Sequence, residues 1–135
     1  MSKIIPFVTV KGALQALEFY KEIFHVKQVG DITMLSNIDG FEDHKFEGKV
    51  GHMTVELGES TFFMNDFLYE YPVDEGTNIQ FVVDLESEEN LRKAFISLSE
   101  DGEIIEELHE VFWGALFGTV KDKFGVTWQI YYGHK

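Results

Sequence analysis

The side chains of this 135-residue sequence that could exchange a proton near neutral pH are its five histidines. His52 lies in a segment with strand periodicity, in the phase opposite the apolar residues. There it could act as a general base or orient a ligand, or it could be a structural residue held by a hydrogen bond. The other four lie at a helix end, in a polar loop, among acidic residues and in the tail: His25, His44, His109 and His134.

A proton-transfer enzyme would need a second group beside His52. The sequence places no second histidine or carboxylate to complete such a pair. Glu56 is the second residue along the same face, four positions on and roughly 13 Å away by the rise of a strand. The chain has no cysteine, which excludes disulfides, thiolate metal sites and cysteine nucleophiles. The residues therefore supply half of an acid–base pair.

The elements that must position these residues occur twice in the same order. Each copy is predicted to be a strand, a helix, a strand and a hairpin, because apolar residues alternate in the strand segments and recur every three or four residues in the helices. The first helix is expected to bury Leu14, Leu17, Tyr20, Ile23 and Phe24. The predicted ranges are 4–12, 13–26, 27–38 and 50–66, with a polar loop at 39–49, and then 77–85, 87–102, 103–111 and 115–132.

Local signals support this duplication. The hairpin pairs Thr54-Val55 with Thr61-Phe62 are repeated as Thr119-Val120 with Thr127-Trp128. Ser87 is the expected N-cap of the second helix and Gly102 its stop, while Gly30 predicts an irregularity in the strand at 27–38. The fold class is therefore α+β, with two βαβββ modules in one domain: module one at 1–66, a connector at 67–76 and module two at 77–135.

Alternation gives each strand one apolar face, expected to pack on a helix, and one mixed face. A mixed face that is partly aromatic and partly polar suits a small-molecule pocket, although a solvent-facing sheet has the same pattern. The apolar faces are predicted to carry Val8, Val10, Met53, Val55, Leu57, Ile79, Phe81, Val83, Trp128, Ile130 and Tyr132. The mixed faces are predicted to carry Phe7, Thr9, His52, Thr54, Phe63, Asn78, Gln80, Gln129 and Tyr131.

Two aromatic residues precede the last hairpin. Phe112 and Trp113 follow an acidic strand, and exposed rings there would be costly. They are expected either to close over a cavity or to pack at a subunit interface. In the hairpin itself, Asp122 and Gly125 are typical turn residues.

The formal net charge of −13 limits the classes of molecule that the protein is expected to bind. DNA, RNA and an anionic membrane surface would all be repelled, since the eleven Lys and Arg residues are scattered. The chain start lacks the apolar region of a signal peptide, and no apolar run approaches transmembrane length. We therefore expect a soluble cytoplasmic protein that binds neither nucleic acid nor membrane.

Three segments carry a family resemblance: GALQALEFYKEIF, GHMTVELGESTFFMND and VFWGALFGTVKDKFGVTWQI. They resemble the PhnB-like family of the vicinal oxygen chelate superfamily, which includes glyoxalase I, bleomycin-resistance proteins and extradiol dioxygenases. The resemblance implies a curved mixed sheet around a shared cavity, helices outside, and a homodimer. Members are often labelled demethylubiquinone methyltransferase. The sequence has no Gly-rich strand-to-helix turn for a nucleoside cofactor, so no cofactor is expected.

The resemblance also implies where metal-using relatives place their ligands, on the first and last strands of each module. In this sequence those positions hold Ile5, Phe63, Asn78 and Gln129. Ile and Phe cannot ligate, and neutral amides are weak ligands for a divalent ion. We therefore predict no metal.

Three functions remain open. The favoured one is a metal-independent protein that binds a small, partly apolar or aromatic ligand. The alternatives are a lyase, isomerase or hydrolase that uses His52 as its catalytic residue, and a structural or regulatory dimer without a ligand. We expect His52 to lie in a cavity with Phe7, Phe63, Gln80, Gln129 and Trp113. The full set of expected ligand-binding residues is Phe7, Thr9, Thr54, Phe63, Asn78, Gln80, Phe112, Trp113, Gln129 and Tyr131.

Overall fold

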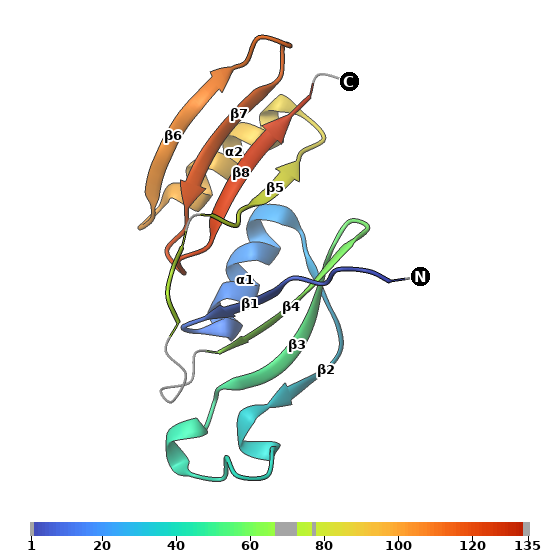
Figure 1. Cartoon of the computed structure of the whole chain (residues 1–135), viewed down its shortest axis with the longest axis vertical. Helices are drawn as coiled ribbons and strands as arrows, with labels where there is room; N and C mark the ends of the chain where they lie inside the picture. The colour runs from blue at the N-terminus through green and yellow to red at the C-terminus, as the bar shows by residue number, and fades with distance from the viewer. Residues whose placement is uncertain (1, 67–72, 77, 134–135) are drawn as a thin grey trace. The chain divides into compact units, whose positions relative to one another are not determined.

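The computed structural model of the chain describes residues 2–66, 73–76 and 78–133 (Figure 1). It divides into two compact units, Met1–Val73 (unit 1) and Asp74–Lys135 (unit 2). Most of the predicted connector at 67–76 lies outside the described residues.

Unit 1 is a four-stranded mixed sheet with one helix. Its strands are β1 (Phe7–Val10), β2 (Lys27–Met34), β3 (Val50–Leu57) and β4 (Ser60–Asp66), and its helix is α1 (Ala13–Phe24). The strand order is β1-β4-β3-β2, with β1 parallel to β4 and the other neighbours antiparallel. The register between β2 and β3 shifts between Val29 and Thr33, which confirms the irregularity expected at Gly30.

Unit 2 repeats this topology. Its strands are β5 (Phe81–Asp84), β6 (Glu103–Glu110), β7 (Leu116–Lys121) and β8 (Thr127–Tyr132), and its helix is α2 (Glu88–Ser99). The order is β5-β8-β7-β6, again with only the first pair parallel (Figure 1). The predicted α+β fold with two βαβββ modules is confirmed.

The core of unit 1 lies between α1 and the apolar face of its sheet. Met53, Val55 and Met64 are fully buried, as the alternation of the strands predicts. The helix buries Ala13, Ala16, Leu17, Tyr20 and Phe24. The expected helix face was wrong at Leu14, which is exposed, and at Ile23, which is half-buried. The small side chains of the two alanines form the buried face instead.

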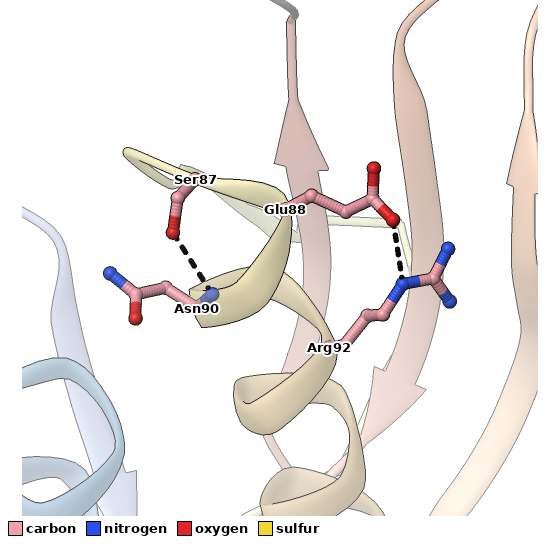
Figure 2. A network of polar contacts seen from close by, with 4 residues as sticks. All are labelled: Ser87, Glu88, Asn90 and Arg92. Atoms are coloured by element: carbon pink, nitrogen blue, oxygen red, sulfur yellow. Dashed lines mark hydrogen bonds and ion pairs between the residues drawn. The ribbon is translucent and has the colours of Figure 1, made fainter.

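Unit 2 buries Leu91, Ala94, Phe95 and Leu98 of α2 together with the sheet residues Val83, Val120, Trp128 and Ile130. Ser87 caps the helix as predicted, since its side chain accepts a hydrogen bond from Asn90 N at 3.1 Å (Figure 2). Arg92 and Glu88 form an ion pair one turn apart at 2.9 Å (Figure 2).

The end of α2 corrects the role expected for Gly102. The residue with left-handed backbone is Asp101, at φ 57°. Gly102 serves close packing instead, because a Cβ there would lie 2.5 Å from the carbonyl oxygen of Lys121. The glycine therefore lets the end of the helix approach β7.

Two further expectations were wrong. The polar loop at 39–49 contains a short 3-10 helix (η2, His44–Phe46), in which Phe46 is buried and packs against Phe41 with 5.0 Å between ring centroids. A second 3-10 helix, η1, spans Leu35–Asn37. Ile79, predicted to face the helix of unit 2, is 77% exposed because pairing with β8 begins only at Phe81.

Candidate functional site

The face of the unit 1 sheet that points away from α1 brings together residues from three strands. Phe7 on β1 is paired with Phe63 on β4, and Phe63 is paired with Thr54 on β3. His52 lies two residues before Thr54 and therefore on the same face. With Thr9, two residues after Phe7 on β1, the face carries five of the predicted site residues, placed there by alternation with the buried residues.

Three rings on this face form a cluster, which we call the His52 cluster: Phe7, His52 and Phe63. The His52 and Phe63 centroids are 4.5 Å apart at an interplanar angle of 62°. Phe7 meets both rings edge-on, at 6.0 Å from each. These are favourable geometries for aromatic pairs. Phe7 is 53% exposed and His52 and Phe63 are half-buried, so the cluster is open to a ligand.

The His52 ring makes ring contacts and no hydrogen bond with any residue in the described part of the chain. A structural histidine would be expected to use at least one nitrogen in such a bond. Neither Glu56 nor another carboxylate is bonded to it there. Toward the described residues its nitrogens are thus unoccupied, and in the neutral ring one could donate a hydrogen bond to a ligand and the other accept one.

Polar groups flank the cluster. Thr9 Oγ1 donates to Asn65 Oδ1 at 2.7 Å, and the two residues are register partners on β1 and β4. Asn65 was missed in the sequence, although it lies two residues after Phe63 and so shares its face. The Asn65 NH₂ group makes no hydrogen bond with a residue in the described part of the chain.

The corresponding face of unit 2 carries the other predicted residues. Gln129 Nε2 donates to Gln80 Oε1 at 2.9 Å, and Trp113 Nε1 donates to the Tyr131 hydroxyl at 3.2 Å. Phe112 and Asn78 are exposed, and Asn78 lies ahead of β5. The predicted cavity that joins His52 with Gln80, Gln129 and Trp113 combines residues of both units and stays a prediction.

The residues at the metal positions do not fit a divalent ion. Ile5 and Asn78 lie before the first residues of β1 and β5. On the parallel neighbours β1 and β5, the residues that pair with Phe63 and Gln129 are Phe7 and Val82, and neither can ligate. Among the described residues, no three His, Asp or Glu side chains are close enough to hold a metal ion.

Side chains of the protein itself occupy the N-termini of both α-helices. Asp66 Oδ1 accepts from Gly12 N and Ala13 N, each at 2.9 Å, at the start of α1. The first turn of α2 carries Glu88 and Glu89, which would repel an anionic group. Neither start resembles a cradle for a nucleoside cofactor.

Comparison with known proteins shows which family the chain belongs to. A model of the family described as 3-demethylubiquinone-9 3-methyltransferase matches residues 2–131. The chain belongs to this PhnB-like family. It is also 32% identical over 83 residues to protein YjdN of Escherichia coli, a match that covers 60% of this chain and 54% of that protein. The matched part is thus about half the length of this curated relative.

Solved structures confirm the fold of the PhnB-like chain. The PhnB protein of Bacillus cereus is 27% identical, with a TM-score of 0.76 over 97% of this chain and 99% of that one. A glyoxalase/bleomycin resistance protein/dioxygenase family enzyme of Burkholderia phytofirmans, 12% identical, has a TM-score of 0.65 over 93% and 94%. The fold is therefore that of glyoxalase and bleomycin-resistance proteins, as the sequence resemblance implied.

The family description names a methyltransferase, which would need a site for a nucleoside methyl donor. The residues at the two described helix N-termini do not fit such a donor, for the reasons given above.

No described helix is both long and apolar enough to span a membrane.

Proposed function

We propose that this PhnB-like protein binds a small, partly aromatic ligand on the His52 cluster without a metal ion. One observation carries the proposal: His52 contacts two phenylalanine rings, yet neither of its nitrogens is hydrogen-bonded to a described residue. Phe7 and Phe63 would contact the ring of the ligand, and His52 would fix its polar group. Mostly apolar surface with a few placed polar groups is typical of ligand sites.

Binding is favoured over the enzyme alternative by what surrounds His52. A general base acts best with a second group that takes or returns the proton. The residue opposite His52 on β2 is Thr33, and no described carboxylate is bonded to the ring. The site is therefore better suited to orienting a ligand than to transferring a proton.

The test begins with a thermal-shift screen of small neutral aromatic compounds, with and without divalent metals. A ligand that binds only the native state at about 100 times its Kd adds about 2.7 kcal/mol to the free energy of unfolding. A compound found in this way is then titrated against His52→Gln. We expect the variant to keep its fold and to bind several-fold more weakly, because the amide can replace one hydrogen bond of the imidazole but not both.

The matched control is His44→Gln, since His44 is an exposed histidine whose Nδ1 lies 2.9 Å from Glu47 Oε1. It should leave ligand affinity unchanged. If His52→Gln lost about 1–3 kcal/mol of stability while its folded fraction bound the compound with unchanged affinity, His52 would be structural and the proposal would fail.

The proposal includes two properties of the whole protein. The purified protein should retain no stoichiometric divalent ion after dialysis, and about one Zn, Ni, Mn or Fe per chain by elemental analysis would contradict this. We also propose that the protein is cytoplasmic, which its acidic composition supports, and that it is a homodimer, which the family resemblance of the sequence supports. A monomer mass by light scattering at micromolar concentration would reject the dimer.

A further inference from the structure

A row of side chains crosses all four strands of unit 2 on the face opposite α2. Asp84 is paired with Tyr131, Tyr131 with Phe117, and Phe117 with His109. The His109 and Phe117 rings are 4.6 Å apart. Trp113 joins the row through its hydrogen bond to Tyr131. We call Trp113, Phe117 and Tyr131, with Phe112, the unit 2 aromatic face.

The loop that carries two of these rings has a fixed geometry. Val111 N donates to Ala115 O and Gly114 N to Val111 O, each at 2.8 Å, and Gly114 takes the left-handed backbone that closes the turn, at φ 88°. Phe112 meets Trp113 edge-on, with 4.7 Å between centroids. Phe112 is nevertheless 96% and Trp113 58% exposed. Two aromatic rings in contact with each other are thus presented to solvent, which is typical of a binding surface.

The charges beside this face are negative. Glu106 Oε2 lies 3.3 Å from His109 Nε2, and Glu106 is paired with Thr119, two residues from Phe117 and on the same side of β7. Asp84 is at the other end of the row. Unit 2 has thirteen acidic and five basic residues in all.

The basic residues of unit 2 that the structure describes have contacts elsewhere. Arg92 and Lys93 pair with glutamates on α2 itself. Lys121 pairs with Glu75, and Lys123 lies over the ring of Phe124 in the β7–β8 turn. Of the described charged residues, Lys121 shares this side of β7 but lies four residues from Phe117 and pairs with Glu75, whereas Glu106 and Asp84 are closer to the rings in register.

We propose that the unit 2 aromatic face binds small organic cations that carry a flat ring. The ring would stack on Trp113, the positive charge would interact with the π-face of Trp113 or Tyr131, and Glu106 would add a Coulombic attraction. This goes beyond the site at the His52 cluster, where the hydrogen-bonded pair beside the rings, Thr9 and Asn65, is neutral. An anionic ligand would be repelled by Glu106 and Asp84.

The experiment titrates the full chain, labelled with ¹⁵N, with N-methylquinolinium and separately with quinoline, its uncharged counterpart. The titration is carried out at pH 8. The indole N–H signal of Trp113 is the reporter. Trp128 is an internal control, since it is buried and its Nε1 donates to Asp122. We expect N-methylquinolinium to shift the Trp113 signal saturably and the Trp128 signal very little.

The charge requirement is tested in two ways. Quinoline should bind roughly two- to fivefold more weakly than N-methylquinolinium, as expected for loss of one cation–π contact at an exposed site. Glu106→Gln should weaken the binding of N-methylquinolinium by a similar factor. Glu89→Gln, which removes the same charge from the exposed face of α2, should leave the affinity unchanged.

Three results would overturn the inference. Equal affinity for quinoline and N-methylquinolinium would show that the face binds apolar rings without regard to charge. An equal loss of affinity for N-methylquinolinium in Glu89→Gln and Glu106→Gln would show that the net charge of the protein, and not Glu106, attracts the cation. A shift confined to residues around His52 would place the cation in unit 1. The proposed function has separate readouts, because it is judged on neutral compounds and on His52→Gln.

Discussion

The two units repeat one order of strands, but their helices begin on different chemistry. In unit 1, Gly12 offers no side chain, and Asp66 reaches α1 from the end of β4, 54 and 53 residues away from the two N–H groups that it binds. Its other oxygen accepts from Val50 N at 2.7 Å. In unit 2, Ser87 caps α2 locally, and the place that corresponds to Asp66, three residues after Gln129, holds Tyr132.

The hairpins differ in the complementary way. The β3–β4 turn is tight, since Leu57 is paired directly with Ser60. The β7–β8 turn is longer and is built around Asp122, which accepts from Phe124 N at 2.9 Å, Val126 N at 3.0 Å and Trp128 Nε1 at 2.8 Å. Each unit therefore has one buried aspartate that accepts three N–H groups, at the helix start in unit 1 and at the hairpin in unit 2.

This difference shows that the topology of a unit and the pairing of its buried N–H groups depend on different residues. Both units reproduce the apolar alternation that directs a sheet face to a helix, so that pattern suffices for the topology. The polar anchors satisfy whichever N–H groups each unit leaves buried, and one carboxylate can do so from a distant strand. Replacing each anchor in turn should therefore weaken its own unit and spare the other.

The largest effect is expected for Asp66→Ala. The substitution leaves the N–H groups of Gly12, Ala13 and Val50 without their acceptor, and the last two residues are fully buried. We expect a loss on the order of 3 kcal/mol, measured by denaturant unfolding. Faster hydrogen exchange should be concentrated in α1 and β3. Asp31→Ala on exposed β2 is the control, and a loss below about 1 kcal/mol in Asp66→Ala would refute the anchor role.

Asp122→Asn should have the next largest effect, about 2 kcal/mol. The amide oxygen can still accept from the turn, but its NH₂ group would face the indole N–H of Trp128, donor against donor. The Trp128 indole proton should exchange faster and shift, while unit 1 amides keep their exchange rates. Asp74→Asn, at an exposed residue of the same unit, is the control. Unchanged exchange at Trp128 would show that the turn adjusts without this hydrogen bond.

Ser87→Ala should cost less, about 1 kcal/mol, because a single hydrogen bond to Asn90 N is lost at an exposed helix start (Figure 2). Ser87→Asp should restore most of the stability, since aspartate also caps and suits the helix dipole. A loss as large as that of Asp66→Ala would mean that local and distant caps are equivalent, and the contrast between the units would disappear.

The sequence predicted the features that depend on period and local chemistry. The two modules, both hairpins, the Ser87 cap and the phase of His52 all follow from alternation and turn residues, and the structure confirms them. The faces of Phe7, Thr54 and Phe63 follow for the same reason. Register pairs such as Thr9 with Asn65 were not predictable, because they depend on which residues two distant strands place side by side.

Distant polar bonds were missed for a related reason. Asp66 gave no local capping signal, since its partners at Gly12 and Ala13 are more than fifty residues away. Gly102 was assigned to helix termination, because a close approach to β7 cannot be seen from neighbouring residues. Phe46 was hidden in a polar segment, where composition predicts a loop although one ring is buried.

The smallest effect is expected for Glu75→Gln, which tests an exposed anchor of unit 2. Lys121 Nζ lies 2.8 Å from Glu75 Oε1. The hydrogen bond and the charge of Glu75 raise the pKa of Lys121 above its ordinary value of 10.5, with a smaller contribution from Glu103. Because the pKa of Lys121 is higher in the folded than in the unfolded state, the ion pair stabilises the folded protein at any pH below the unfolded-state pKa. This contribution is lost as the pH rises through the folded-state pKa.

In Glu75→Gln, the pKa of Lys121 should therefore fall back toward 10.5, as measured from the NMR shifts of its side-chain methylene next to Nζ. Stability at pH 7 should change very little, because exposed ion pairs contribute little. The wild type and the variant should converge further above pH 10.5, where the wild-type pair loses its charge. Glu89→Gln should leave Lys121 unchanged. A marked loss at pH 7 would instead indicate packing, since Glu75 lies against Gly125, where a Cβ would collide with it.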